Sequence, residues 1–380
     1  MTNALGAAAE QLTCDLVAID SVNPGLVPGA AGERNAVALL QQRLDAAGFH
    51  TEIFGSAERP SLVAIYDGGP GRSVVLNGHL DTVGVDGMPE PFAARIEGTK
   101  LIGRGTSDMK GGVAGMVVAA EALAAQGVAG RIVLALVADE EDASIGTEEL
   151  IAHGVTGDVC IVGEPSWMNI AVAHRGFAVT KVSITGKAAH SSQPQHAVDA
   201  IAGLGRLITA VHAANDALSK AQPHQYLEPA AFAVTVVNGG SAPFTIAAHA
   251  DAIVEKRTLP GETGESVVAE VQAMLDDIAT LDSSFDARVE LVMARDAWEV
   301  VEDSAASELI GCLQRQQPAD RVGAPYWMES ALWDAAGVPS VVFGPAGGGM
   351  HAINEWVELD QLHAYPVILV DAIREFLGAA

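Results

Sequence analysis

Two adjacent acids, Glu140 and Glu141, end an apolar run in the stretch RIVLALVADEED. The run has the composition of a buried strand, and neighbouring side chains at the end of a strand point to opposite sides. One carboxylate of the pair could therefore bind a metal ion while the other faces a bound water molecule. That arrangement is typical of a metal-dependent hydrolase. Acidic doublets are also common on protein surfaces, so the interpretation depends on the other polar residues of the chain.

Further potential ligands follow other apolar runs. His79 and Asp81 lie two residues apart in VVLNGHLDTVG, so both side chains can lie on one side of an extended backbone. Asp81 could then hold the second ring nitrogen of the histidine. Asp108 precedes Gly111 and Gly112 in LIGRGTSDMKGG, where glycines let a ligand approach the backbone. Taken singly, the first pattern is usually a polar turn and the second a helix cap.

Glu164 and His351 complete this set of residues. Glu164 ends an apolar strand in VGEP, and His351 follows a strand and a glycine-rich loop in VVFGPAGGGMH. Parallel strands that end at one edge of a sheet bring their last residues into one crevice, where acids repel one another unless a cation neutralises them. Two histidines with several carboxylates form a ligand set that suits zinc or a similar divalent ion. The pattern therefore predicts a two-metal site.

Alternating strands and helices must position these residues. Apolar runs bounded by Gly, Pro or Asp predict strands at Ser61–Tyr66, Ser73–Leu76, Arg131–Ala138, Asp158–Val162 and Ser340–Phe343. Helical periodicity predicts helices at Asn35–Ala47, Val113–Ala125 and Ala305–Leu313. Because each strand is apolar on both faces, the pattern predicts an α/β layer structure with a mostly parallel central sheet.

The pattern changes from about Gly176 onward. Strands here alternate apolar with polar residues, as in FAVTKVSITG and ARVELVMA, and two helical segments accompany them at Ala197–Ala214 and Glu265–Ile278. An antiparallel sheet with one covered face has this pattern. We therefore predict a catalytic domain in two parts, residues 1–174 and 295–380, interrupted by a smaller α+β domain at residues 175–294.

Composition and charge narrow the class of protein. The chain of 380 residues is long enough for two domains. Its net charge of -27 repels phosphate backbones and anionic lipid surfaces, so we expect neither nucleic acid nor membrane as a partner. Cys14, Cys160 and Cys312 are far apart among apolar residues, which predicts buried thiols rather than disulfides. The first residues lack the features of a signal peptide, which predicts a cytoplasmic protein.

The motifs occur in a characteristic order from His79 to Glu355: GHLDTV, GRGTSDMKGG, the glutamate pair, GEP, GKAAHSSQP, KRTLPG and an FGP…H…E ending. Together they resemble the M20 metallopeptidase family, most of all its branch of acetylornithine deacetylase, succinyl-diaminopimelate desuccinylase, aminoacylase and glutamate carboxypeptidase. The resemblance covers nearly the whole chain. It implies a zinc-peptidase-like catalytic domain, a ferredoxin-like lid and dimerisation domain, and a homodimer.

The resemblance also implies a ligand set for two divalent ions. His79 and Glu164 would hold one ion, Glu141 and His351 would hold the other, and Asp108 would bridge the two. Zinc is the ion that the resemblance favours, although cobalt and manganese accept similar ligands.

The remaining roles come from the same resemblance. Glu140 would be the general base and Asp81 would support His79. In the inserted domain, His190 would stabilise the tetrahedral oxyanion, commonly from the partner subunit of the dimer, and Arg257 would grip the carboxylate of the substrate. Without the resemblance, His190 reads as a solvated loop residue and Arg257 as a partner of one of the many acids.

The implied reaction is hydrolysis of the amide bond of a small N-acyl amino acid, with a dipeptidase or carboxypeptidase as the alternative. Two positions depart from the family pattern: Phe244 stands at or near a place where the family often has asparagine, and Met328 with Glu329 replaces a Thr-Asp pair. A metal-binding protein that has lost catalysis is a further alternative, although every ligand position is filled. The glycine-rich stretches do not follow the pattern of a nicotinamide-binding loop.

Overall fold

The structure of the chain, a computed structural model, describes residues 2–378 and forms two compact units. The first unit contains the described residues up to Val172, Val300–Val322 and those from Met328 onward, and the second contains Ala173–Glu299 and Gly323–Trp327. The segment Gly323–Trp327 lies outside the range predicted for the inserted domain. It joins the second unit because Arg175 N–H donates a hydrogen bond to the carbonyl of Ala324 over 3.2 Å and Gly323 packs against the carbonyl of Tyr226.

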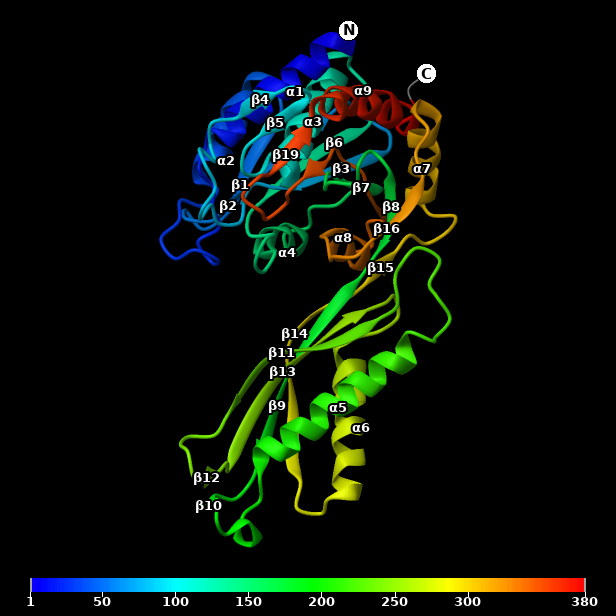
Figure 1. The fold of residues 1–380 in the computed structure, drawn as a ribbon. Helices are drawn as coiled ribbons and strands as arrows, with labels where there is room; N and C mark the ends of the chain where they lie inside the picture. Colours follow the sequence, from blue (N-terminus) through cyan, green and yellow to red (C-terminus); the bar gives the residue numbers. More distant parts are fainter. Residues whose placement is uncertain (1, 379–380) are drawn as a thin grey trace. The chain divides into compact units, whose positions relative to one another are not determined.

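The first unit is built on a mixed sheet with the strand order β1-β2-β6-β3-β7-β17-β8, and β15 and β16 pair with β8 (Figure 1). The strands are β1 His50–Gly55, β2 Pro60–Asp67, β3 Ser73–His79, β6 Arg131–Val137, β7 Val159–Val162 and β17 Ser340–Val342. β8 Ile170–His174 and β16 Arg321–Ala324 begin in this unit and end in the second, to which β15 Trp298–Glu299 belongs. The central strands β6, β3, β7 and β17 are parallel, whereas β1, β2 and β8 pair antiparallel. The α/β class and the parallel centre of the sheet are thus confirmed.

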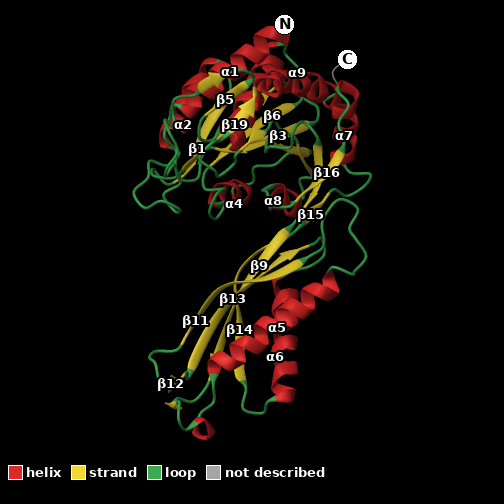
Figure 2. Ribbon diagram, in the orientation of Figure 1, coloured by secondary structure: helices red, strands yellow, loops and turns green. Residues whose placement is uncertain are grey.

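Helices cover both faces of this sheet, with α1, α3 and α9 on one side and α4 and α8 on the other (Figure 1); Figure 2 shows the same helices in red. The helices of this unit are α1 Thr2–Val17, α2 Arg34–Ala46, α3 Gly111–Ala125, α4 Ile145–Ala152, α7 Ala305–Gln316, α8 Ser330–Ala335 and α9 Leu359–Phe376. Small residues let α3 pack closely, and a Cβ at Gly115 would meet the ring of Tyr365 at 2.3 Å. This packing holds α3 closely against α9, which carries Tyr365.

A second, smaller sheet of the first unit has the order β18-β19-β5-β4. Its strands are β4 Arg95–Glu97, β5 Lys100–Ile102, β18 Gly347–Gly348 and β19 Trp356–Glu358. β19 pairs with β5, which leads into the π-helical turn η1 at Thr106–Lys110. The pairing therefore brings the residues just before β19 next to the loop that carries Asp108.

The second unit has an antiparallel sheet of order β11-β13-β9-β14. Its strands and helices are β9 Gly176–Thr185, β10 Ala189–His190, η2 Pro194–His196, α5 Ala200–Leu218, β11 Ala231–Gly239, β12 Thr245–Ile246, β13 His249–Thr258, α6 Gly264–Leu281 and β14 Asp286–Arg295. Alternate residues of β9 and β13 are buried, and together with α5 and α6 they form one apolar core. The antiparallel sheet with one covered face and the two helices agree with the prediction.

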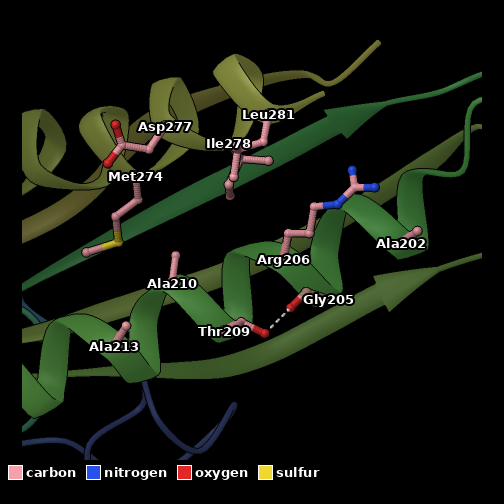
Figure 3. A pocket seen from close by; sticks show the side chains of 10 residues that line it. All are labelled: Ala202, Gly205, Arg206, Thr209, Ala210, Ala213, Met274, Asp277, Ile278 and Leu281. Carbon is pink, nitrogen blue, oxygen red and sulfur yellow. Dashed lines mark hydrogen bonds between the residues drawn. The ribbon is translucent and has the colours of Figure 1, made fainter. Parts of the chain in front are cut away.

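A surface groove lies between α5 and α6 of the second unit (Figure 3). Small residues of α5, Ala202, Ala210 and Ala213, line one side of it, and Met274 and Leu281 of α6 line the other. Leu281 is 88% exposed. The groove is thus largely apolar and open to solvent in the structure of this unit.

The predicted elements lie where the structure places strands and helices, with ends that shift by a few residues. The expectation for the cysteines was wrong at one position, because Cys14 is only partly buried while Cys160 and Cys312 are buried. All three are free thiols. Among residues 2–378, the structure has no helix long and apolar enough to cross a membrane.

Candidate metal centre

The predicted ligands of the first unit gather at the carboxyl ends of its parallel strands. β3 ends at His79, which pairs in register with Val137, the last residue of β6. Glu140 and Glu141 lie in the turn after β6, and Glu164 follows the neighbouring strand β7. Because the strands are adjacent and parallel, their ends meet at one edge of the sheet. The sheet therefore delivers these side chains from separate parts of the chain to one place.

His79, Asp108 and Glu164 form one potential metal-binding group, in which the ligand atoms all lie within 4.8 Å of one another. Nε2 of His79 is 3.1 Å from Oδ1 of Asp108 and 3.5 Å from Oε1 of Glu164. The other ring nitrogen, Nδ1, lies 3.0 Å from the backbone oxygen of Asp81 and 3.5 Å from its Oδ1. Asp81 thus holds the imidazole so that Nε2 faces the group.

Asp108 also belongs to a second group, with Glu141 and His351. Nε2 of His351 lies 3.2 Å from Oδ2 of Asp108 and 3.0 Å from Oε2 of Glu141. His351 comes from the loop between β18 and β19, and its side chain is 55% exposed. Since Oδ1 of Asp108 faces His79 and Oδ2 faces His351, a single carboxylate joins the two groups.

Crowding of carboxylates disturbs their protonation. Burial, followed by the nearby charge of Glu164, raises the pKa of Glu140 well above its ordinary value. Burial and the charge of Asp108 raise the pKa of Glu164 in the same way and raise the pKa of Glu141 to about 7. These acids therefore lie in a strongly negative potential that favours a proton or another cation.

The two histidines respond to the same potential. Burial opposes the charged form of His79, yet hydrogen bonds to Asp108 and Asp81 raise its pKa well above the ordinary value. Hydrogen bonds to Asp108 and Glu141 raise the pKa of His351 to about 10. Without a metal ion, the imidazole of His351 would hold a proton at neutral pH, and the pKa of His79 is shifted in the same direction.

This donor set fits divalent metal ions. Imidazole nitrogens and carboxylate oxygens are ligands that zinc accepts, and in each group they converge within ligand distance of one another. A bound cation would take the place of the protons that the site otherwise retains. The structure thus brings together all five predicted ligands of the first unit: His79, Asp108, Glu141, Glu164 and His351.

Comparison with known proteins identifies the family. The model of peptidase family M20/M25/M40 matches residues 75–375, which is most of the chain. The chain belongs to this family. The family and the curated relatives support a metal-dependent hydrolase, and the matched region includes both potential metal-binding groups.

Two curated relatives show similarity along most of the chain. A succinyl-diaminopimelate desuccinylase from Ruegeria pomeroyi is 29% identical over 97% of this chain and 99% of its own length. An acetylornithine deacetylase from Myxococcus xanthus is 28% identical over 89% of this chain and 91% of its own.

Two solved structures share the fold of the chain. An aminopeptidase from Bacillus cereus matches with a TM-score of 0.77 at 18% identity, over 98% of both chains. A dinuclear metal-binding peptidase of family M20 from Bacillus subtilis matches with a TM-score of 0.75 at 14% identity, over 99% of both chains. At these identities the likeness supports the fold of this M20 chain.

The pKa shifts predict how the stability of the metal-free M20 protein depends on pH. His351 and Glu141 bind protons more tightly in the folded than in the unfolded chain, so the free energy of unfolding falls as pH rises. The contribution of His351 is complete below about pH 6.5 and is lost as pH rises through about 10, and that of Glu141 is lost between about 4.5 and 7.

We therefore expect the thermal unfolding midpoint of chelator-treated protein to fall between about pH 6 and 8, below the range in which Lys110, whose pKa burial lowers to about 8, has the opposite effect. Metal-free His351→Gln is the control, because it should lack the part of this fall above neutral pH. A metal-free protein that became more stable over the same range would contradict the shifts of His351 and Glu141.

Sequence patterns missed the residue that holds Asp108 in place. Glu355, just before β19, is buried, and its Oε1 accepts hydrogen bonds from the backbone N–H groups of Ser107 and Asp108 at 2.9 and 3.0 Å. Its Oε2 accepts from Gly105 N–H at 2.9 Å and from Arg104 Nη1 at 2.8 Å. One carboxylate therefore fixes the whole loop before α3. Glu355 stands in the family ending described above, but no local pattern assigns it this contact.

Replacing Glu355 should destabilise the protein. In Glu355→Gln, an amide NH₂ would face backbone donors and the buried guanidinium of Arg104 would lose its counter-charge. Breaking a buried ion pair in this way costs about 3–5 kcal/mol. Denaturant unfolding of the metal-free protein would measure the loss, with Glu358→Gln on β19 as a control that breaks no ion pair found among the described residues. An unchanged unfolding midpoint would refute this role of Glu355.

The second unit carries the other two predicted residues, His190 and Arg257. His190 on β10 is exposed, and its Nδ1 lies 2.7 Å from Oγ of Ser192. Arg257 on β13 pairs with Glu255 at 2.7 Å. The guanidinium carbon lies 5.6 Å from the centroid of the Phe177 ring. The structure therefore shows local partners for both residues and leaves their roles as proposals.

Phe244, the departure noted in the sequence, lies close to His190 along the paired strands. His190 pairs with Thr245, the residue after Phe244, and Ser191 N–H donates to the carbonyl of Phe244 over 2.8 Å. The Phe244 side chain is 75% exposed. An exposed aromatic ring therefore accompanies the predicted oxyanion residue.

Proposed function

We propose that this protein is a two-metal amide hydrolase that cleaves a small N-acyl amino acid, as a deacetylase or desuccinylase does. The observation that carries the proposal is the carboxylate of Asp108, whose two oxygens each lie in a separate ligand group. The names of the curated relatives support an N-acyl amino acid as the substrate.

Two divalent ions, zinc in preference to cobalt or manganese, would be held by the residues of these groups. His79 and Glu164 would hold one ion, Glu141 and His351 the other, and Asp108 would hold both. When bound, such ions lower the pKa of a water molecule and polarise the carbonyl of the substrate. His79 is buried and held by Asp81, whereas His351 is more exposed, so the second group is the more accessible of the two.

Glu140 would act as the general base. Its Oε2 lies 4.0 Å from Nε2 of His79, and its side chain is 12% exposed. The carboxylate is thus beside the group of His79 without being a member of either group among the described residues. A pKa raised well above the ordinary carboxyl value suits a group that accepts a proton from water at neutral pH. Glu140 would then pass this proton to the leaving nitrogen of the amide.

His190 and Arg257 would have roles in binding the substrate. We propose that Nε2 of His190 stabilises the oxyanion from the partner subunit of a homodimer, since Nδ1 is already bonded to Ser192. Arg257 would bind the carboxylate of the substrate with its guanidinium group. Phe244 beside His190 would present an apolar surface to the acyl group or the amino-acid side chain.

A substrate panel tests the proposal. Protein stripped with a chelator and reloaded with zinc or cobalt would be assayed against N-acetyl and N-succinyl amino acids and against dipeptides. We expect activity only after reloading, with an N-acyl amino acid as the best substrate. Preference for dipeptides would indicate a peptidase instead. Stoichiometric metal binding without turnover of any member of the panel would favour a metal-binding protein that has lost catalysis.

A further inference from the structure

The segment Ser21–Gly25 lies beside the candidate metal centre, although no catalytic pattern in the sequence marks it. Val22 forms a parallel bridge with Thr82, and Asn23 N–H donates a hydrogen bond to the carbonyl of Thr82 over 2.9 Å. Asn23 is fully buried. The segment is therefore fixed along the chain just after β3, where Asp81 lies.

The side chain of Asn23 connects two buried carboxylates. Its Nδ2 donates to Oδ2 of Asp81 at 2.7 Å and to Oδ1 of Asp139 at 3.0 Å. Its Oδ1 accepts from Gly25 N–H at 2.8 Å, which fixes the orientation of the amide. A primary amide offers two hydrogens on one nitrogen, one for each carboxylate. Aspartate would offer none and serine only one.

Asp81 transmits this contact to the glutamate pair. Its Oδ1 accepts the backbone N–H of Glu140 and its Oδ2 accepts that of Glu141, each at 3.2 Å. The same carboxylate lies 3.5 Å from Nδ1 of His79. Asn23 therefore holds the residue on which the proposed base and a ligand of each metal group depend.

Asp139, the second carboxylate that Asn23 binds, is itself held by other residues. Asp139 accepts a hydrogen bond from Arg59 Nη2 at 2.6 Å, and Arg59 also pairs with the buried Glu33 at 2.9 Å. The backbone of Asp139 has a φ of 72°, in the left-handed region that residues other than glycine adopt only where the surroundings hold them. The turn that carries the glutamate pair is thus fixed from both sides.

We propose that Asn23 is a positioning residue of the metal centre: its amide NH₂ group fixes Asp81 against Asp139 and so sets the places of Glu140, Glu141 and His79. The inference rests on the proposed metal ligands and extends them to a residue that touches neither metal nor substrate. Asn23 differs from a general packing residue, because its partner Asp81 contacts residues of both metal groups.

Asn23→Asp tests the proposal directly, since it keeps the shape of the side chain and replaces the donor with a third carboxylate. We expect its zinc affinity to fall by about 10–100-fold, the usual effect of losing a residue that supports metal ligands. Turnover should fall with it at saturating substrate, while KM changes little. Isothermal titration of chelator-stripped, folded protein with zinc alone measures the affinity.

Asn215→Asp is the matched control. The side chain of Asn215 on α5 likewise both donates and accepts hydrogen bonds, but its partners are the backbone carbonyl and N–H of Phe232 at 2.8 and 2.7 Å, and it lies in the second unit. This variant should lose stability and keep the zinc affinity of the wild type. Asn23→Ser is the second test variant, because it adds no charge and retains one donor, and it should lose less affinity than Asn23→Asp.

The outcomes separate this inference from the proposed function. Wild-type protein that binds no divalent ion would overturn the metal centre itself. Wild-type protein that binds zinc, with both Asn23 variants binding it equally well, would overturn only the role of Asn23. Weakened binding in the Asn23 variants and unchanged binding in Asn215→Asp would establish that role, even if the substrate of the enzyme were still unidentified.

Discussion

Glu140→Gln should lower kcat by about 10²–10⁴-fold while the protein retains its metal ions, because proton transfer by a positioned side chain contributes a factor of this size. Glutamine has nearly the same shape as glutamate and can accept a hydrogen bond, but it cannot take a proton from water. Glu140 is a member of neither metal-binding group among the described residues. Its backbone N–H would still bond Asp81, so the turn should keep its conformation.

Two measurements together check this expectation: the metal content per chain and the turnover of the best substrate from the panel. Asp142→Asn is the matched control, since Asp142 is an exposed acid of the same turn and loses one charge in the same way. It should keep wild-type kcat. Loss of metal in Glu140→Gln would show that Glu140 is a ligand, and wild-type turnover with full metal content would remove it as the base.

The apolar pattern predicted the strand before the glutamate pair but not the conformation of the pair itself. We expected neighbouring side chains at the end of a strand to point to opposite sides, but β6 ends at Val137 and the pair lies in a turn. The N–H groups of both residues donate hydrogen bonds to Asp81, which holds the turn that carries them. The strand was predictable from its apolar run, whereas the turn depends on contacts with distant residues.

Asp81 was predicted as the support of His79, but two other supports of the site, Asn23 and Glu355, were beyond the reach of the sequence. Asn23 precedes a proline, a pattern that reads as a turn, and only the fold shows that its amide lies between two carboxylates. Glu355 lies 247 residues from Asp108 in the chain, so no local spacing connects them. The ligands at strand ends were predictable because the ends of parallel strands meet at one edge of the sheet. This prediction needs only the type of sheet and no knowledge of individual contacts.

The helices differ in how well the sequence pattern predicts them. α3 was predictable, since its run of small apolar residues is bounded by glycines at one end and by a polar turn at the other. α9, which packs against α1 and α3, contains Pro366 and so lacks an uninterrupted helical pattern. Burial of its apolar face in the first unit outweighs the hydrogen bond that proline removes.

Asp108→Asn should reduce binding of both metal ions, because Asp108 is the residue that the two groups share. Asparagine keeps one oxygen acceptor but replaces the other with an NH₂ group and removes the negative charge. One ion would then face an amide nitrogen that cannot act as a ligand, and the other would lose electrostatic attraction. Since loss of a supporting residue alone costs about 10–100-fold in affinity, we expect at least this loss for both ions.

Single replacements in the two groups provide the comparison. Glu141→Gln removes a carboxylate from the group of His351, and Glu164→Gln removes one from the group of His79. Each should leave one ion bound tightly, so that elemental analysis after dialysis finds about one zinc per chain in these variants and less in Asp108→Asn. If Asp108→Asn retained one tightly bound ion, its carboxylate would serve a single metal group and the bridged two-metal arrangement would be wrong. The stoichiometry thus decides between a shared ligand and two neighbouring sites, without requiring the substrate to be known.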